Sequence, residues 1–111
     1  MIYKLLRAAE WSQAKAESQF KGSPVDLADG FIHFSTAAQV QETAEKHFAG
    51  VSGLVLAEVA ESRLPHLLKW EASRGGQLFP HLYAPLPLSA IIRTWVIPLG
   101  REGRFIFPRV L

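Results

Sequence analysis

One short segment, residues 29–36 with the sequence Asp-Gly-Phe-Ile-His-Phe-Ser-Thr, constrains the fold of this chain more than any other. Asp-Gly is typical of a turn, Phe-Ile-His-Phe of a short strand, and Ser-Thr before an Ala- and Glu-rich run of a helix start. The segment therefore predicts a strand that leads at once into a helix over about 37–48. Because the first turn of a helix leaves N–H groups unpaired, Ser35 and Thr36 are expected either to cap the helix alone or also to hold a phosphate or a carboxylate there.

His33 lies between two apolar residues of the expected strand, Ile32 and Phe34. Side chains alternate between the two faces of a strand, so His33 is expected to point away from the face that carries its neighbours. A lone histidine in an apolar strand is either a hydrogen-bonded structural residue or a functional group. Both readings stay open at this point.

The rest of the chain shows an irregular series of strands with few helices. A further helix is expected over 10–20, strands over 2–7, 53–60, 67–72 and 89–98, and an edge strand over 104–108. Leu64-Pro65 is expected to interrupt the secondary structure. Because strands crowd the second half, we predict an α+β fold with two or three helices and a mostly antiparallel or mixed sheet.

The segment 78–88 contains three prolines, which are Pro80, Pro85 and Pro87. Proline lacks a backbone N–H and therefore disfavours both a helix interior and a central strand. We expect this segment to be ordered only by the packing of its aromatic residues against the rest of the domain.

The composition restricts the class of protein. With 111 residues, 49% hydrophobic and 20% charged, the chain is expected to form one globular domain over 1–111. The absence of cysteine excludes disulfides and thiolate zinc sites. No segment has the apolar length of a signal peptide or a membrane span, so we expect a cytoplasmic protein without a membrane partner. The formal charge is +2 and the basic residues form no run, so nucleic acid is not an expected partner.

Glu71 follows Trp70 on an expected strand whose other face is apolar. A carboxylate beside an indole can have a raised pKa and act as an acid or a base. The alternative is an ordinary ion pair with Lys69 or Arg74.

His81 and Tyr83 share a side of the proline-rich segment if that segment is extended, because they are two residues apart. They are either functional groups or core residues with a polar tip. His33, His81 and Glu71 together could in principle bind a metal, but no metal-binding spacing of histidines occurs, so no metal is expected.

Three blocks of the sequence resemble the signature of a known family. They are segment 29–36 with its Gly-Phe-Ile-His-x-Ser motif, Lys-Trp-Glu at 69–71, and Phe-Pro-His-Leu-Tyr at 79–83. Together they are similar to the small bacterial family called domain of unknown function 952, and the resemblance covers nearly the whole chain. That family is similar in fold to the ADP-ribosyltransferases, which have a split, mainly antiparallel sheet around a cleft that binds NAD.

The resemblance implies roles for individual residues. His33 falls where poly-ADP-ribose polymerases place a tyrosine that stacks on nicotinamide, and where RNA 2′-phosphotransferases of the same superfamily place a histidine. Lys4 stands where many members of the small family have a first-strand histidine. Glu71 is a rough match in order to the catalytic glutamate of the superfamily.

These inferences predict an ADP-ribosyltransferase-like domain that binds NAD or a related nucleotide and transfers ADP-ribose. The candidate catalytic residues are His33, Glu71 and His81, and the candidate ligand-binding residues are Lys4, Ser35, Thr36, Trp70 and Tyr83. One alternative is a non-catalytic module that binds a nucleotide or a protein. Another is an RNA-phosphate enzyme, which requires at least one of the arginines at 7, 63, 74 and 93 to lie near His33.

Overall fold

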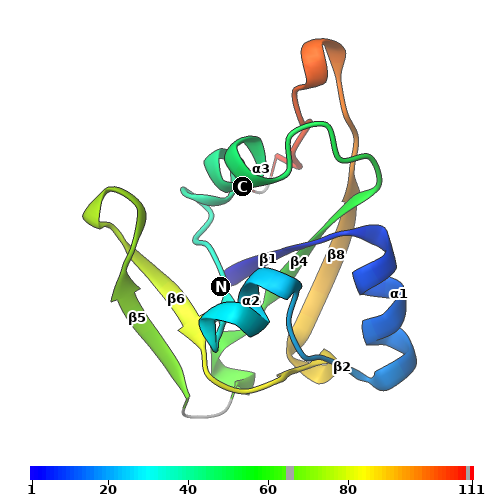
Figure 1. Cartoon of the computed structure of the whole chain (residues 1–111). Coiled ribbons are helices and arrows are strands. Elements are labelled where there is room, and N and C mark those ends of the chain that lie inside the picture. The colour runs from blue at the N-terminus through cyan, green and yellow to red at the C-terminus, as the bar shows by residue number, and fades with distance from the viewer. Residues whose placement is uncertain (65–66, 110) are drawn as a thin grey trace.

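The computed structural model describes residues 1–64, 67–109 and 111, and this part of the chain has an α+β architecture with antiparallel sheets (Figure 1). The helices are α1 (Ala8–Glu17), α2 (Pro24–Asp29) and α3 (Val40–His47). The strands are β1 (Ile2–Leu6), β2 (Gln19–Phe20), β3 (Ile32–His33), β4 (Leu54–Val59), β5 (Leu68–Ala72), β6 (Leu78–Leu82), β7 (Leu86–Pro87) and β8 (Ile91–Ile97). No helix of the described residues has the length and apolar character of a membrane span.

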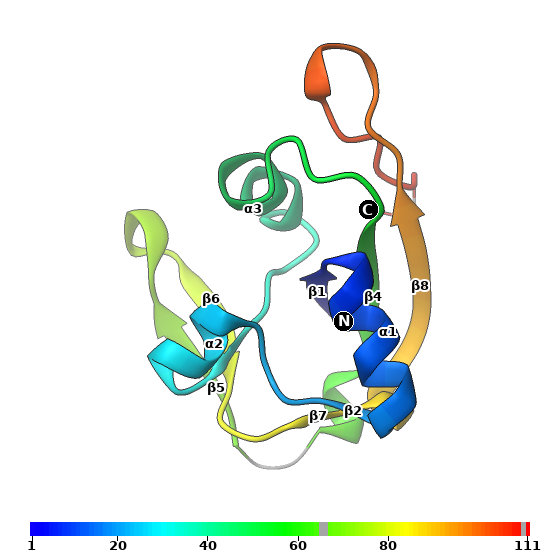
Figure 2. The ribbon, with the colours of Figure 1, turned by 45° about the vertical axis from the view of Figure 1, so that its right-hand side comes forward.

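The first sheet has the order β1-β4-β8, and both of its faces are buried near the central strand. Every residue of β4 is buried, because its side chains alternate between two hydrophobic cores. One core contains Val55 and Ala57 together with Ala14 of α1, and the other contains Leu56 together with Ala44 of α3. The two helices therefore cover opposite faces of this sheet (Figure 2).

The second sheet has the order β3-β6-β5 and carries an apolar and a polar face. Ile32 pairs with Leu82, and both belong to the first of the two cores. The next pair along the ladder is His33 with His81, which alternation places on the opposite face. The expected orientation of His33, away from its apolar neighbours, is therefore confirmed.

The two sheets are joined at one point along β1. Tyr3 N–H donates to Ser35 O over 2.8 Å, and Ser35 N–H donates to Tyr3 O over 2.9 Å. Beyond Ser35 the chain turns toward α3, so the edge of β1 continues with no strand of the described residues beside it (Figure 1).

The proline-rich segment differs from the expectation, because β6 is the central strand of the second sheet with Pro80 fully buried inside it. Pro80 C=O accepts a hydrogen bond from Phe34 N–H over 3.0 Å. In an antiparallel strand the N–H and the C=O of one residue point to the same side. At position 80 that side faces β3, which has already ended at His33. A proline is tolerated here because its missing donor falls opposite the end of the neighbouring strand.

Two further expectations are corrected. The helix expected from about residue 37 begins at Val40, after a turn. The expected edge strand over 104–108 is not formed, and its main-chain pairing is the isolated bridge between Leu99 and Phe105. The break expected at Leu64-Pro65 lies partly outside the described residues.

Candidate functional site

A cavity of about 380 Å³ opens beside the free edge of β1. Its lining comes from five parts of the fold, which are the β1 edge, the α2 segment, the polar face of the β3–β6 ladder, the turn between β5 and β6, and α3 with the residue after it. Among the residues that line it are Lys4, Leu5, Arg7, Asp26, Asp29, His33, Ser35, His47, Arg74 and His81.

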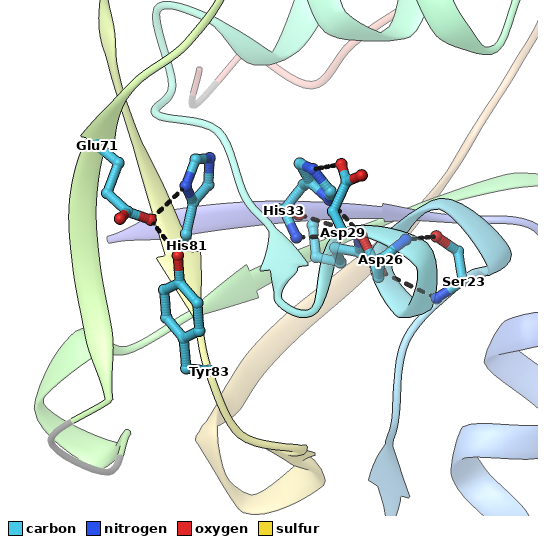
Figure 3. A network of polar contacts seen from close by, with 8 residues as sticks. Ser23, Asp26, Asp29, His33, Glu71, His81 and Tyr83 are labelled. Carbon is cyan, nitrogen blue, oxygen red and sulfur yellow. Dashed lines mark hydrogen bonds and ion pairs between the residues drawn. The ribbon is translucent and has the colours of Figure 1, made fainter.

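The most buried polar group of the site is Asp26, which is 2% exposed. Lys4 Nζ lies 3.0 Å from Asp26 Oδ2, and His33 Nδ1 lies 2.6 Å from Asp26 Oδ1. The backbone N–H groups of Ser23 and His33 also donate to this carboxylate, over 2.9 and 3.1 Å. Asp26 thus connects β1, β3 and α2 (Figure 3).

A local sequence signal places Asp26. Ser23 is the N-cap of α2, Pro24 follows at the first position, and the Ser23 and Asp26 side chains cap each other's backbone N–H. Six residues make too short a helix to stand alone, so α2 depends on these caps and on the contacts of Asp26.

His33 is held between two carboxylates. Its Nδ1 faces Asp26, and its Nε2 lies 2.9 Å from Oδ2 of Asp29, which is half exposed. A carboxylate only accepts hydrogen bonds, so both contacts are satisfied together when the ring carries a proton on each nitrogen. Lys4 Nζ also donates to the carbonyl oxygen of His33 over 2.9 Å.

Burial and charge oppose each other at Asp26. Burial raises the pKa of Asp26, but the His33 hydrogen bond, the Lys4 charge and the two backbone donors outweigh it and hold the pKa well below its ordinary value. Burial lowers the pKa of Lys4, and the Asp26 carboxylate counteracts part of that effect. The pair is therefore held as a desolvated ion pair at the base of the site.

A second polar group lies on the same face of the sheet, between β6 and β5. Glu71 Oε1 accepts from Tyr83 Oη over 2.7 Å and lies 2.8 Å from His81 Nδ1 (Figure 3). The hydrogen bonds from Tyr83 and His81 lower the pKa of Glu71, so the raised pKa that was one of the two possibilities considered from the sequence is not found. The Trp70 indole does not cause a rise, because Trp70 lies on the opposite face of β5 from Glu71.

Aromatic rings join the two polar groups. The Phe31 ring stacks on His81 with a centroid distance of 4.1 Å, and lies 4.6 Å from the ring of His33. The rings of His33 and His81 are 5.5 Å apart and meet edge to face. The two histidines therefore form one continuous wall of the cavity.

The structure brings together six of the eight residues selected from the sequence. Lys4, His33, Ser35 and His81 line the cavity, and Glu71 and Tyr83 join them through the hydrogen bonds to His81. Trp70, which is 43% exposed, lies on the far face of the sheet and is not part of this group.

The anion site expected at Ser35 and Thr36 is not formed as a helix start. The helix begins four residues after Thr36, at Val40. Ser35 N–H donates to Tyr3, and Thr36 N–H donates to Oε1 of Gln39 over 3.0 Å. Both backbone donors are occupied, so they are not free to bind an anion.

Several cavity residues were missed by the sequence analysis. Asp26 was overlooked because the segment around it was too short to be predicted as an element, although its capping box was a usable signal. Arg7 and Arg74 line the same cavity as His33. Their position meets the requirement for an RNA-phosphate enzyme, so that alternative stays open.

Neither of the other two arginines belongs to the cavity. Arg63 donates to Ser89 O, and Arg93 lies 3.4 Å from Glu58 on the first sheet. Within the described part of the chain, no group of three or more histidine and carboxylate side chains is arranged to hold a metal ion.

Comparisons with known proteins give a family but no activity. The crystal structure of protein CC0527 from Caulobacter crescentus is 53% identical, with a TM-score of 0.91 over 95% of this chain and 92% of that one. The solution NMR structure of CC0527 is 55% identical, with a TM-score of 0.82 over 92% and 88%. Both were structural genomics targets. A comparison with curated proteins finds no match.

The family described as "Protein of unknown function (DUF952)" matches residues 5–94, which is most of the chain. The chain therefore belongs to the DUF952 family.

Proposed function

We propose that the cavity binds NAD or a closely related nucleotide, and that the protein transfers or releases ADP-ribose from it. The observation that carries the proposal is a cavity that joins an aromatic and imidazole wall to an open strand edge and to two guanidinium groups. Each of these parts suits a different portion of a dinucleotide. The resemblance described above, in which His33 falls where poly-ADP-ribose polymerases place a tyrosine that stacks on nicotinamide, supports the same ligand.

The open edge of β1 suits the carboxamide of nicotinamide. Tyr3 uses its backbone N–H and C=O toward Ser35, and alternation directs those of Leu5 to the same side. Leu5 lines the cavity, and among the described residues its only ladder partner, Leu56, lies on the other side. A free N–H and C=O on a strand edge can pair with a carboxamide, which has one acceptor and one donor.

The imidazole wall suits a flat ring. His33 and His81 present ring surface to the cavity within 5.5 Å of each other, with Phe31 stacked behind His81. Stacked or edge-to-face contacts of this kind contribute about 0.5–1.5 kcal/mol per ring pair.

The guanidinium groups suit the diphosphate. Arg7 lies over the Phe48 ring at 4.8 Å and has no ion-pair partner in the described part of the chain. Arg74 lies over Phe79 at 5.0 Å and is partly neutralised by Glu42, whose Oε1 lies 3.0 Å from Arg74 Nε. Arginine binds phosphate oxygens through paired N–H donors, so these two residues are the expected phosphate contacts.

If the protein is an enzyme of this class, the bond that breaks is the glycosidic bond to nicotinamide. The ribose then acquires positive charge, which a nearby carboxylate stabilises. Asp29 is the half-exposed carboxylate of the cavity wall.

The alternative of a non-catalytic binding module is favoured by one observation. Both nitrogens of His33 already face carboxylates, so this histidine has no free nitrogen for proton transfer while those contacts last. A measurement of nicotinamide release from NAD distinguishes an enzyme from a binding module. With a binding module, NAD raises the melting temperature of the protein but no nicotinamide is released.

Thermal unfolding with and without NAD, ADP-ribose and nicotinamide tests the proposal. A ligand that binds the folded state at 100 times its Kd stabilises it by about 2.7 kcal/mol and raises the melting temperature. We expect ADP-ribose to raise it in the wild type, much less in Arg7→Ala, and to the wild-type extent in the control Arg101→Ala, whose arginine lies outside the cavity. No shift with any of the three ligands at millimolar concentration would refute nucleotide binding.

A further inference from the structure

Of the two paired histidines on the β3–β6 ladder, His81 is the one whose second ring nitrogen has no protein partner among the described residues. The residue is buried, it lines the cavity, and its Nδ1 is turned toward Glu71. In Figure 3 the other ring nitrogen, Nε2, lies on the side of the ring away from Glu71. His33 differs, because its Nε2 faces Asp29.

Glu71 and Tyr83 determine which nitrogen of His81 carries the proton. The hydrogen bond from Tyr83 lowers the pKa of Glu71 and raises that of Tyr83, so near neutral pH Glu71 is a carboxylate and Tyr83 keeps its hydroxyl proton. A carboxylate only accepts, so His81 Nδ1 must be the donor in their 2.8 Å contact. In the neutral ring, Nε2 then carries no proton and has a free lone pair, which is the form that a general base requires.

The geometry points to His81 Nε2 as a general base that takes a proton from a water or hydroxyl group bound in the cavity, with Glu71 as its positioning residue. This inference rests on the proposed binding of NAD and names the second substrate of that reaction. It assigns the acid–base role to His81 alone, and gives His33 a structural and binding role.

The reaction balances with these participants. The glycosidic C–N bond breaks and its electron pair neutralises the positively charged nicotinamide nitrogen. The oxygen of the water or hydroxyl forms a bond to the ribose carbon, and its proton moves to His81 Nε2. No oxidant, reductant or metal is needed.

The chemistry of the base favours a hydroxyl group as the acceptor. An imidazole base is matched to a hydroxyl that loses its proton during attack, so water or an alcohol is the expected acceptor.

The tautomer of His81 can be measured without any ligand. In the ¹⁵N-labelled protein at pH about 8.5, about two units above an ordinary imidazole pKa, long-range ¹H–¹⁵N spectra distinguish a protonated from an unprotonated ring nitrogen. We expect Nδ1 protonated and Nε2 unprotonated in the wild type and in Glu71→Gln, whose amide oxygen still accepts. We expect a mixture of tautomers in Glu71→Ala. An Nε2-protonated ring in the wild type would overturn the inference.

Nicotinamide release from NAD, followed by chromatography, tests the catalytic role. We expect His81→Gln to lower kcat about 100-fold or more, as for the loss of a general base, while ADP-ribose still raises its melting temperature. Glu71→Gln is expected to keep more of kcat than Glu71→Ala, with KM similar in both. Glu45→Ala, an exposed residue of α3 outside the cavity, is the control.

The outcomes separate the two proposals. A wild type that binds none of the nucleotides refutes the proposed function itself. A wild type that binds ADP-ribose but releases no nicotinamide overturns the assignment of His81 and leaves a binding module. If the wild type and a folded His81→Gln variant turn over NAD equally fast, His81 is not the general base, but the proposed enzymatic activity still stands.

Discussion

The side chain on which this site most depends is Asp26. Its carboxylate contacts Lys4, His33 and two backbone N–H groups, and both Asp26 and Lys4 are nearly inaccessible to solvent. We expect Asp26→Ala to lower the free energy of unfolding by about 3–5 kcal/mol, because it leaves the Lys4 charge buried without its partner. Urea denaturation measures the change. The control is Asp29→Ala, whose half-exposed carboxylate is expected to contribute about 1 kcal/mol or less. Equal losses in the two variants would contradict this account.

Stability at low pH follows from the same carboxylate. The folded-state pKa of Asp26 lies below its ordinary value of 3.8, so its contribution is complete above that value and is lost as the pH falls below it. We expect the free energy of unfolding to decline between about pH 5 and pH 2. A Lys4→Met/Asp26→Leu double variant lacks this titrating group and is expected to show a shallower decline. Parallel pH profiles of the two proteins would show that Asp26 does not contribute.

Tyr3 gives a prediction at high pH. Burial, together with the 2.8 Å hydrogen bond from its hydroxyl to Glu58, raises the pKa of Tyr3 to about 12. The chain has two tyrosines, so Tyr83→Phe leaves Tyr3 as the sole chromophore of this kind. We expect the tyrosinate absorbance of that variant to rise with a midpoint near pH 12 while the protein stays folded. A midpoint near 10 in the folded protein would refute the contact with Glu58.

At the scale of elements, the C-terminal end of α2 matters to the site, because α2 carries Asp26 and Asp29. It ends at Gly30, which has φ +84° and whose N–H donates to Asp26 O over 2.9 Å. Among the described residues, apart from those adjacent in the chain, a Cβ at Gly30 would have no heavy atom within 4 Å, so the cost of a substitution comes from the backbone conformation. We expect Gly30→Ala to destabilise the protein by about 1–2 kcal/mol, and Gly30→Asn by less, because asparagine tolerates this conformation. Chemical denaturation of both variants measures the difference, and an equal effect would contradict a backbone origin.

Across the whole molecule, the two sheets differ in how they are covered. The first sheet has a core on each face, whereas the second has one apolar face and one that borders the cavity. We therefore expect amide hydrogens of β4 to exchange only through global unfolding, and those of β6 and β5 to exchange faster, through partial opening. Native-state hydrogen exchange followed by NMR tests this order. Protection in β6 equal to that in β4 would show that the two sheets open as one unit.

Patterns within single segments predicted much of this architecture. The apolar run of β4, the alternation in β1 and β5 and the strand character of residues 89–98 gave strands close to their observed bounds, because these patterns are local properties of the chain. The same alternation placed Trp70 and Glu71 on opposite faces of β5. The mixed α+β class with mostly antiparallel sheets is confirmed.

The sequence by itself determined the positions of β1, β4, β5 and β8 and the orientation of His33 away from the core, because both follow from the spacing of apolar residues. Only the tertiary structure decided which polar groups meet. Lys4 and Asp26 are 22 residues apart, and they pair because β1 and α2 pack together. Pro80 lies in a central strand because β3 ends beside it, and Ser35 pairs with Tyr3 although the two are far apart in the sequence. Such contacts depend on the packing of distant segments, which local propensity does not encode.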